Sequence, residues 1–164
     1  MIEEQRYARN EERLAELYPT FADRVEKVLR ELEALGWYPR IQDAWRSIND
    51  QEEAYNKGHA KVHFGFHNVT GINGKKEALA VDMLDDEAPL NPSKPYLLQL
   101  AAEAEKAGLV TGIRWGLPDE MVKAIDTAIA NEEWRAPVKI GWDPTHIQPT
   151  GITIAEAKAG KRPD

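Results

Sequence analysis

The order of the elements in this sequence predicts an α+β domain with a small, mainly antiparallel sheet flanked by helices. Helical patterns come first, and short strand-like segments then alternate with further helices. The connections between these segments are long and irregular. The chain has 164 residues and no internal repeat, and this length is typical of one domain with a single core. We therefore expect residues 1–164 to fold as one domain.

Two helices are expected within residues 1–36, and we expect them to pack on the core because they are too short to form a separate module. Residues 11–17 have a helical pattern, and a stronger one follows in "PTFADRVEKVLRELEALG". Thr20 is the candidate N-cap of this second helix, and Gly36 marks its end. Its apolar residues recur at a helical spacing, at Phe21, Val25, Val28, Leu29, Leu32 and Leu35.

A strand, a short helix and a loop are expected next. The imperfect alternation in "WYPRIQDAWRS" predicts a strand that leads to Arg46. The segment "NDQEEAYNKG" predicts a helix that Asn49 or Asp50 caps and Gly58 ends. The two glycines within residues 69–77 indicate a surface hairpin or loop.

The segment "ALAVDML" predicts a strand with a polar residue in its interior. On strict alternation Asp82 shares a face with Ala80 and Leu84, so we expect its side chain to be at least half buried. A buried carboxylate costs free energy unless it is paired or binds a metal. Two interpretations of Asp82 follow: a metal ligand, or a partner in an ion pair or at a surface strand end.

The rest of the chain predicts three helices and two strands. "SKPYLLQLAAEAEKAG" is a helix with Ser93 as its cap and Gly108 as its end. "GIRWG" indicates a short strand or the end of one, and "PDEMVKAIDTAIANEE" a helix that Pro118 opens. "PVKIGW" predicts a strand that "HIQP" continues, and the tail "TIAEAKAGKRPD" a short helix that frays.

The charge balance excludes two classes of partner. The chain has 21 Lys and Arg against 28 Asp and Glu, a net charge of −7, whereas nucleic acid and anionic membranes require a basic surface. There is no cysteine, so His, Asp and Glu are the metal ligands available. The charged N-terminus lacks the apolar region of a signal peptide, and no run approaches the ~20 apolar residues of a membrane span. We expect a protein made in the cytoplasm that reaches an outside target only after release.

Three of the four histidines lie close together in the sequence. His67, in the apolar segment "FGFHNV", is a candidate metal ligand or a hydrogen-bonded structural histidine. His59, His63 and His67 are spaced by four residues, which would suit a row of ligands on a helix. The Phe-Gly-Phe segment before His67 disfavours a helix, however, and no Glu follows His63 as the helical zinc motif requires. We interpret His59 and His63 as residues that support the site or face solvent.

The fourth histidine, His146, lies in "KIGWDPTHIQP". Two imidazoles, one carboxylate and an open position form a catalytic zinc site, and His67, Asp82 and His146 would provide them. Zinc acidifies water, and hydrolysis also needs a base to accept the proton. Asp143, on a chain stiffened by Pro144, is the candidate base, although Asp before proline is also a common turn residue.

Hydrolysis of an amide also needs positive charge opposite the oxyanion of its tetrahedral intermediate. Arg46, at the end of a predicted strand, is the candidate for this role. Its planar guanidinium would equally suit a substrate carboxylate. An ordinary surface arginine fits the same sequence.

These residues resemble a known family, the zinc peptidases of peptidoglycan, which includes D-alanyl-D-alanine carboxypeptidases, dipeptidases and phage L-alanyl-D-glutamate endolysins. Its members carry a Tyr-Arg-Ser turn followed by Gln, the motif Ser-x-His-x-x-Gly-x-Ala-x-Asp, a Trp-Gly pair, and Asp/Glu-x-x-His. Residues 41–148 contain similar segments in the same order, "AWRSINDQ", "GFHN…ALAVD", "GIRWG" and "DPTHIQ". The matching positions are Arg46, Ser47, Gln51, His67, Asn68, Ala80, Asp82, Trp115, Gly116, Asp143, His146 and Gln148.

The resemblance implies a small α+β fold with zinc in a central cleft and a peptidoglycan stem peptide as substrate. The base is usually Glu in the carboxypeptidase and dipeptidase branches and Asp in the L-alanyl-D-glutamate branch. The prediction is therefore an endolysin-like endopeptidase of bacteriophage type, acting as a monomer on the cell wall after release. The implied ligands are His67, Asp82 and His146, and the implied base is Asp143. The implied substrate contacts are Arg46, Ser47, Gln51 and Trp115.

Two departures from the family pattern concern the cleft. Gly65 stands where the family usually has Ser, and fifteen positions instead of seven separate His67 from Asp82 because residues 69–77 are inserted. The insertion has the composition of a loop, so the two ligands can still converge.

Three other functions are compatible with the same residues. A D-alanyl-D-alanine carboxypeptidase or dipeptidase would use a similar site. A non-catalytic relative, as in Hedgehog-type signalling domains, would hold a structural metal and bind partners, although the presence of Asp143 and Arg46 favours an enzyme. In a metal-free α+β binding module these residues would be ordinary surface groups.

Overall fold

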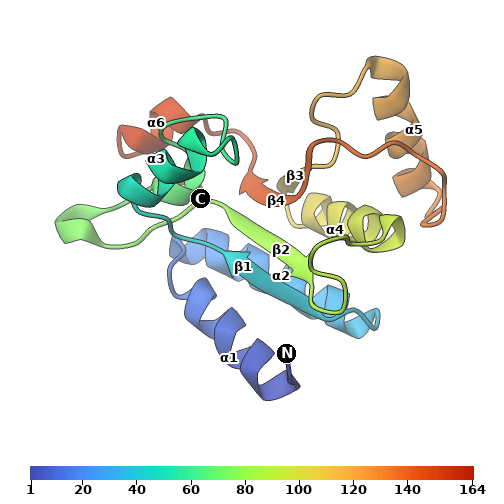
Figure 1. The fold of residues 1–164 in the computed structure, drawn as a ribbon, viewed down its shortest axis with the longest axis horizontal. Helices are drawn as coiled ribbons and strands as arrows, with labels where there is room; N and C mark the ends of the chain where they lie inside the picture. Colours follow the sequence, from blue (N-terminus) through green and yellow to red (C-terminus); the bar gives the residue numbers. More distant parts are fainter.

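The computed structural model describes residues 1–164 and contains six α-helices, four strands and two short 3-10 turns. Figure 1 shows how they are arranged. The helices are α1 (Glu3–Leu14), α2 (Pro19–Ala34), α3 (Ile48–Asn56), α4 (Lys94–Lys106), α5 (Asp119–Ala130) and α6 (Ile154–Lys158). The strands are β1 (Pro39–Asp43), β2 (Val81–Asp85), β3 (Leu109–Gly112) and β4 (Asp143–Pro149), and the 3-10 turns are Phe66–Asn68 and Ile72–Gly74.

The four strands form one sheet in the order β1-β2-β4-β3, and every neighbouring pair is antiparallel. Helices flank this sheet (Figure 1). The predicted α+β class with a small antiparallel sheet is therefore confirmed. No helix is both long and apolar enough to cross a membrane.

The two faces of the sheet differ in character where β2 pairs with β4. Val81 lies opposite Ile147, and Asp82 lies opposite His146. Since opposite residues share a face and successive residues alternate, the first pair turns to one side and the second pair to the other. Val81 and Ile147 are fully buried, whereas the Asp82 side chain is 23% exposed. The expectation that Asp82 is at least half buried is confirmed.

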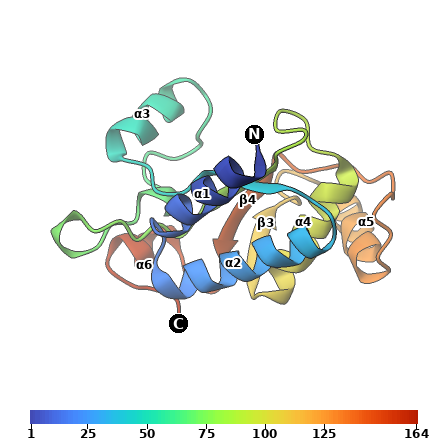
Figure 2. The same ribbon diagram turned by 90° about the horizontal axis from the view of Figure 1, so that it is seen from below.

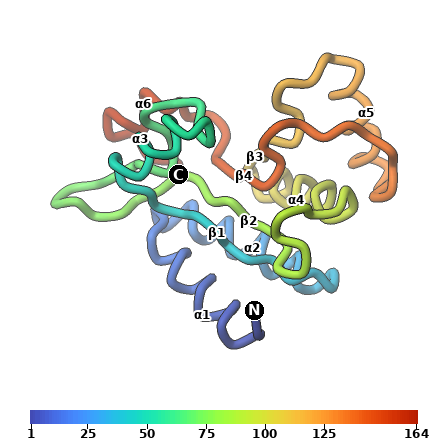
Figure 3. Tube along the Cα trace, in the orientation of Figure 1, coloured from blue at the N-terminus to red at the C-terminus, as the bar shows by residue number.

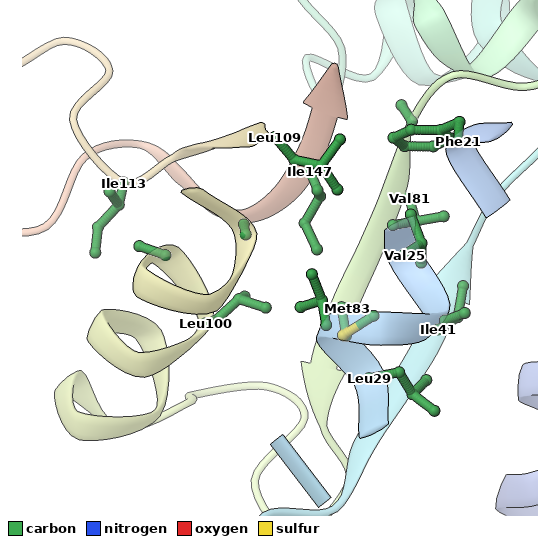
Figure 4. Close-up of a cluster of buried hydrophobic side chains, with 14 of the residues drawn as sticks. Phe21, Val25, Leu29, Ile41, Val81, Met83, Leu100, Leu109, Ile113 and Ile147 are labelled. Atoms are coloured by element: carbon green, nitrogen blue, oxygen red, sulfur yellow. The ribbon is translucent and has the colours of Figure 1, made fainter. Parts of the chain in front are cut away.

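The core lies on the Val81 side of the sheet. One cluster of 30 buried hydrophobic residues draws on segments from α1 to α6, and Figure 4 shows part of it, with Phe21, Val25 and Leu29 of α2 facing Val81 and Met83. Helix α2 packs against α4 and β1. The predicted apolar stripe of α2 is buried except at Leu35, which lies just after the helix and is 50% exposed.

Helix α1 lies along the outer edge of β1 and satisfies its backbone groups. The side chain of Asn10 accepts a hydrogen bond from the Ile41 amide at 2.8 Å and donates one to the Pro39 carbonyl at 3.1 Å. Arg6 donates to the same Pro39 carbonyl at 2.7 Å, and Arg9 donates to the Ile41 carbonyl at 3.1 Å. An edge strand presents unpaired amides and carbonyls, and α1 covers them here. In Figure 2, α1 and α2 lie beside each other in front of the strands.

The N-terminal helix boundaries differ from the sequence prediction. Helix α1 begins at Glu3 and not at residue 11. Thr20 is not the N-cap of α2, since that helix begins at Pro19 and the Thr20 hydroxyl donates to the Pro163 carbonyl at 3.1 Å. Ser47, and not Asn49 or Asp50, caps α3.

The strand boundaries also differ. Strand β1 ends at Asp43, three residues before Arg46. Strand β3 covers Leu109–Gly112, so "GIRWG" contains the end of a strand and is not a strand of its own. The segment "PVKIGW" is not a strand, and β4 begins only at Asp143. Long hydrogen-bonded connections take the place of the expected extensions, because bulges in the pairing of β1 with β2 and of β3 with β4 end the regular ladders.

The C-terminal segment is held against the body of the molecule and does not fray. A capping box of Thr153 and Glu156 opens α6. Arg162, after this helix, forms an ion pair with Glu77 at 3.0 Å and donates to the Thr70 carbonyl at 3.3 Å. These contacts reach the base of the inserted loop at residues 69–77, which projects from the sheet in green in Figure 3.

Candidate metal centre and cleft

Three side chains that can ligate a metal converge on one point at the open side of the sheet. They are His67, Asp82 and His146, and one ligand atom of each lies within 4.8 Å of the others. His67 lies in the 3-10 turn before β2, Asp82 lies in β2 and His146 in β4. The pairing of β2 with β4 places the carboxylate directly opposite one imidazole.

The ring of His67 is fixed by its backbone surroundings. Its Nδ1 lies 2.6 Å from the Ala44 carbonyl and donates to it, so in the neutral ring Nε2 carries the free lone pair. This Nε2 lies 3.5 Å from Oδ2 of Asp82. The turn itself is tied to the segment after β1, because the Arg46 amide donates to the His67 carbonyl and the Asn68 side chain donates to the Arg46 carbonyl, each at 2.8 Å.

The ring of His146 is fixed in the same way. Its Nε2 lies 2.8 Å from Oε1 of Gln148, two residues along β4, and donates to it. Its Nδ1 then faces Oδ1 of Asp82 at 3.6 Å and Oδ2 of Asp143 at 3.8 Å. Metal-binding histidines in proteins usually donate their second ring nitrogen to such an acceptor. The donor set of two oriented imidazoles and a carboxylate therefore fits a divalent cation such as zinc.

The charges of this cluster support one another. Burial alone would raise the pKa of Asp82, but the facing His67 and His146 outweigh it and hold that pKa well below its usual range. Burial alone would lower the pKa of His67, and the charge of Asp82 raises it overall. Burial and the charge of Asp82 raise the pKa of Asp143 against the effect of the two histidines.

Two glycines bring Asp143 into the site. Gly112 at the end of β3 lies so close that a Cβ would collide with the Asp143 carbonyl, and a Cβ on Gly141 would meet the Ile113 carbonyl. The Gly141 amide donates to that same carbonyl at 2.6 Å. A larger residue at either position would push β4 away from β3 at the point where Asp143 enters the cleft.

Arg46 lines the cleft and is held from both sides. Its guanidinium donates to Asp43 through Nε at 3.1 Å and through Nη2, and its Nη1 donates to Oε1 of Gln51 at 2.9 Å. Gln51 is buried, and its amide nitrogen donates to the Val62 carbonyl at 2.8 Å. Ser47 does not line the cleft, because its hydroxyl accepts from the Asp50 amide as the N-cap of α3.

The cleft above these residues has a volume of about 270 Å³. Trp115 forms part of its wall, with its ring centroid 5.2 Å from that of His146 and 5.3 Å from that of Trp142. Gly65, the position that departs from the family motif, also lines it. Segments that span the chain from Arg46 to Ile154 therefore meet around one opening. The lining residues are Arg46, Gln51, His59, Ala60, Lys61, Val62, Gly65, Phe66, His67, Asp82, Trp115, Trp142, Asp143, His146, Gln148 and Ile154.

The two remaining histidines lie outside the metal-binding cluster. His59 is exposed and lines the rim of the cleft. His63 is exposed, lies 2.8 Å from Oε1 of Glu52 and stacks on Tyr55 with ring centroids 3.8 Å apart. Both therefore sit where the sequence interpretation expected them, away from the converging ligand atoms.

Several residues of the site had no role in the sequence analysis. Gln148 orients His146, and its position two residues further along a strand is the signal that places it on the same face. Asp43 orients Arg46, and the Ala44 carbonyl orients His67. Both groups lie at or just after a bulge in β1, which no local pattern predicts. The pairing of Gly112 with Asp143 is a contact between distant segments and has no signal in either one.

No family model matches this chain, and no curated protein sequence matches it. Among solved structures, the crystal structure of the L-Ala D-Glu endopeptidase ChiX of Serratia marcescens is similar to it. The two are 21% identical, the similarity covers 87% of each chain, and the TM-score is 0.48. The candidate site therefore rests on its own geometry.

Proposed function

We propose that this protein is a zinc-dependent peptidase that cleaves the L-alanyl-D-glutamate bond of the peptidoglycan stem peptide. The observation that carries the proposal is the convergence of His67 Nε2, His146 Nδ1 and the Asp82 carboxylate in an open cleft. A second carboxylate, Asp143, lies at the edge of this cluster. Three ligands with a fourth group beside them form the usual plan of a hydrolytic zinc site.

Zinc, when bound, supplies a Lewis acid that polarises a carbonyl and acidifies water. His67, Asp82 and His146 would hold it, and their second hydrogen bonds keep the ligand atoms aimed at one point. Asp143 accepts a proton from the attacking water at its carboxylate and returns it to the leaving amine. In the resembled family, aspartate at this position is typical of the L-alanyl-D-glutamate branch, which is the reason for naming that bond.

The cleft offers further groups for the substrate. Arg46, fixed by Asp43 and Gln51, presents a guanidinium that binds a substrate carboxylate or the developing oxyanion. Trp115 provides an apolar wall beside His146. Gln51 acts through Arg46, because both ends of its amide are already engaged.

Digestion of purified peptidoglycan tests the proposal. Protein purified without a histidine tag is loaded with zinc and incubated with the wall polymer, and the released fragments are identified by mass spectrometry. New termini at L-alanine and D-glutamate are expected, and a chelator should abolish their release. Release of free D-alanine would instead identify a carboxypeptidase, and zinc binding without any fragment would identify a non-catalytic relative.

A further inference from the structure

An irregular segment between α3 and the turn of His67 covers one side of the cleft. This segment, residues 57–65 (the flap), contributes five of the residues that line the cleft. Figure 2 shows that α3 and the chain after it project from the body of the molecule. The flap is connected to the site residues through Gln51, which donates to the Val62 carbonyl and accepts from Arg46.

One cation of the flap extends over the aromatic wall of the cleft. The Lys61 ammonium lies 5.2 Å from the ring centroid of Trp142. Trp142 is 52% exposed and stands next to Trp115, which stands next to His146. A row of rings therefore leads from the candidate metal centre to the outer surface, and Lys61 lies at its outer end.

Lys61 differs from Arg46, the other Lys or Arg that lines the cleft, because no carboxylate of the protein pairs with it within 4.0 Å. Arg46 is paired with Asp43. Lys57, at the start of the flap, is paired with Glu53 at 2.8 Å and does not line the cleft. A Lys over an indole face is only weakly neutralised by it, so the ammonium remains available to an anion.

The charge of the whole chain makes such a cation useful. With a net charge of −7, the protein repels an acidic substrate at long range, and Asp82 and Asp143 add negative charge in the cleft itself. A local positive charge at the entrance offsets this repulsion for a substrate that carries a carboxylate. The same charge gives no advantage to a neutral substrate.

We propose that Lys61 is a specificity-determining residue that binds a carboxylate of the peptide substrate at the outer end of the cleft. The proposal rests on the proposed peptidase function. Since Lys61 lies at the far end of the ring row from the candidate metal centre, its contact is made equally in the bound substrate and in the transition state. Its removal is therefore expected to raise KM and leave kcat unchanged.

The test compares two stem peptides that differ only in a free carboxylate or a carboxamide on the glutamyl residue. The wild-type protein should have about a tenfold lower KM for the carboxylate form. Lys61→Met, which keeps the apolar stem, should bring the two KM values together, and Lys61→Arg should restore most of the difference. Lys57→Met is the matched control and should behave as the wild type.

The proposal is overturned if Lys61→Met keeps the tenfold preference for the carboxylate peptide. It is also overturned if Lys57→Met loses this preference as fully as Lys61→Met does. Raising the salt concentration should shrink the preference in the wild type, and a salt-independent preference also counts against Lys61. Should the wild type cleave neither peptide, the peptidase function falls. The role of Lys61 is then decided by calorimetric Kd values of the zinc-loaded protein for the two peptides. Tighter binding of the carboxylate peptide that is lost in Lys61→Met supports the role, and equal Kd values in the wild type overturn it.

Discussion

The molecule contains two clusters of charged and polar side chains, each with buried members, and they are built in opposite ways. The N-terminal cluster consists of Arg6, Asn10, Glu3 and Glu33. Arg6 is 3% exposed and donates to both glutamates and to the Pro39 carbonyl at 2.7–3.0 Å. Asn10 uses both ends of its amide on the backbone of β1. Every strong donor in this cluster therefore has a partner at normal hydrogen-bond length.

The site cluster consists of His67, Asp82, Asp143 and His146. Its members face one another at 3.5–3.8 Å, beyond normal hydrogen-bond length, although each histidine has a short bond on its other nitrogen. Buried polar groups are normally satisfied. We infer that the saturated cluster serves the fold, and that the site cluster is arranged around a ligand that its members share.

The largest effect should come from removing Asp82 from the site cluster. Asp82→Ala should reduce bound zinc from one per chain to a trace and lower kcat/KM about 10³-fold or more, since metal catalysis contributes several kcal/mol. Zinc should also raise the Tm of the wild type and leave that of the variant unchanged, because only a protein that binds the ion gains stability from it. Elemental analysis and thermal scans provide the measurements.

Asp126→Ala is the control for this variant, as its carboxylate is exposed and pairs with Arg114 far from the ligand atoms. Full zinc occupancy in Asp82→Ala would remove the ligand assignment. A site that includes His63 would then have to be considered, and His63→Ala would test it.

Asp143→Asn should separate proton transfer from metal binding within the same cluster. The amide keeps the shape of the side chain and removes its basicity, so zinc content and Tm should stay unchanged while kcat falls by roughly 10²–10⁴. Steady-state kinetics on a defined stem peptide gives kcat. Near-normal turnover would show that another group accepts the proton, and loss of zinc would show that Asp143 is itself a ligand.

Arg46 shares one property with each cluster. Its guanidinium is paired, as in the N-terminal cluster, and it lines the cleft, as the site cluster does. Arg46→Ala should lower kcat/KM about 10²-fold, as the loss of one oxyanion donor does. Its ion pair with Asp43 is partly exposed, so we expect the free energy of unfolding to fall by no more than about 1 kcal/mol. If the free energy of unfolding fell by several kcal/mol while the kinetics stayed normal, Arg46 would serve the fold and not the reaction.

Features that depend on a local sequence pattern were predicted, and features that depend on contacts between distant segments were not. Helix α2, the helix that Ser93 caps and the face of β2 were predicted because each has a local pattern of apolar residues or caps. The convergence of the three candidate ligand residues was expected from their chemistry and from the order of the motifs in the chain. Local patterns do not show how bulged strands pair, so the predicted strand runs on to Arg46 and the contact of Arg46 with Asp43 has no signal in the sequence.

The N-terminal cluster shows a second kind of information that sequence patterns lack. Helix α1 has few apolar residues, because its buried face carries Arg6 and Asn10 besides Leu14. The helix was therefore predicted to begin only at residue 11. Its stability comes from hydrogen bonds to β1, a partner 29 or more residues away.

Removing Arg6 should cost stability and leave the site intact. Arg6→Met keeps the apolar stem but leaves its partners without a charged donor, so the free energy of unfolding should fall by about 2 kcal/mol. Activity per folded molecule should not change. Urea unfolding measures the loss. Arg30→Met is the control, since its ion pairs are more exposed and should contribute less than about 1 kcal/mol. Equal losses in the two variants would contradict the role assigned to the N-terminal cluster.

The smallest effect concerns a single satisfied group in the core, the Tyr96 hydroxyl, which donates to the Met83 carbonyl of β2 at 2.8 Å. Burial, with a smaller effect of Asp85, raises the pKa of Tyr96 well above its usual value. In the unfolded chain a tyrosine ionises near pH 10, so above that pH the unfolded state binds fewer protons and stability falls as the pH rises.

At pH 7 Tyr96→Phe should therefore cost about 1 kcal/mol, the usual contribution of one hydrogen bond. Above about pH 10 this difference should narrow, because the wild type then loses stability through Tyr96 and the phenylalanine variant does not. All other ionisable groups are shared by the two proteins and cancel in the comparison. Urea midpoints measured in parallel from pH 7 to pH 10.8 provide the test. A constant difference over this range would mean that the Tyr96 hydroxyl reaches solvent when it ionises, and that it does not belong with the satisfied core groups.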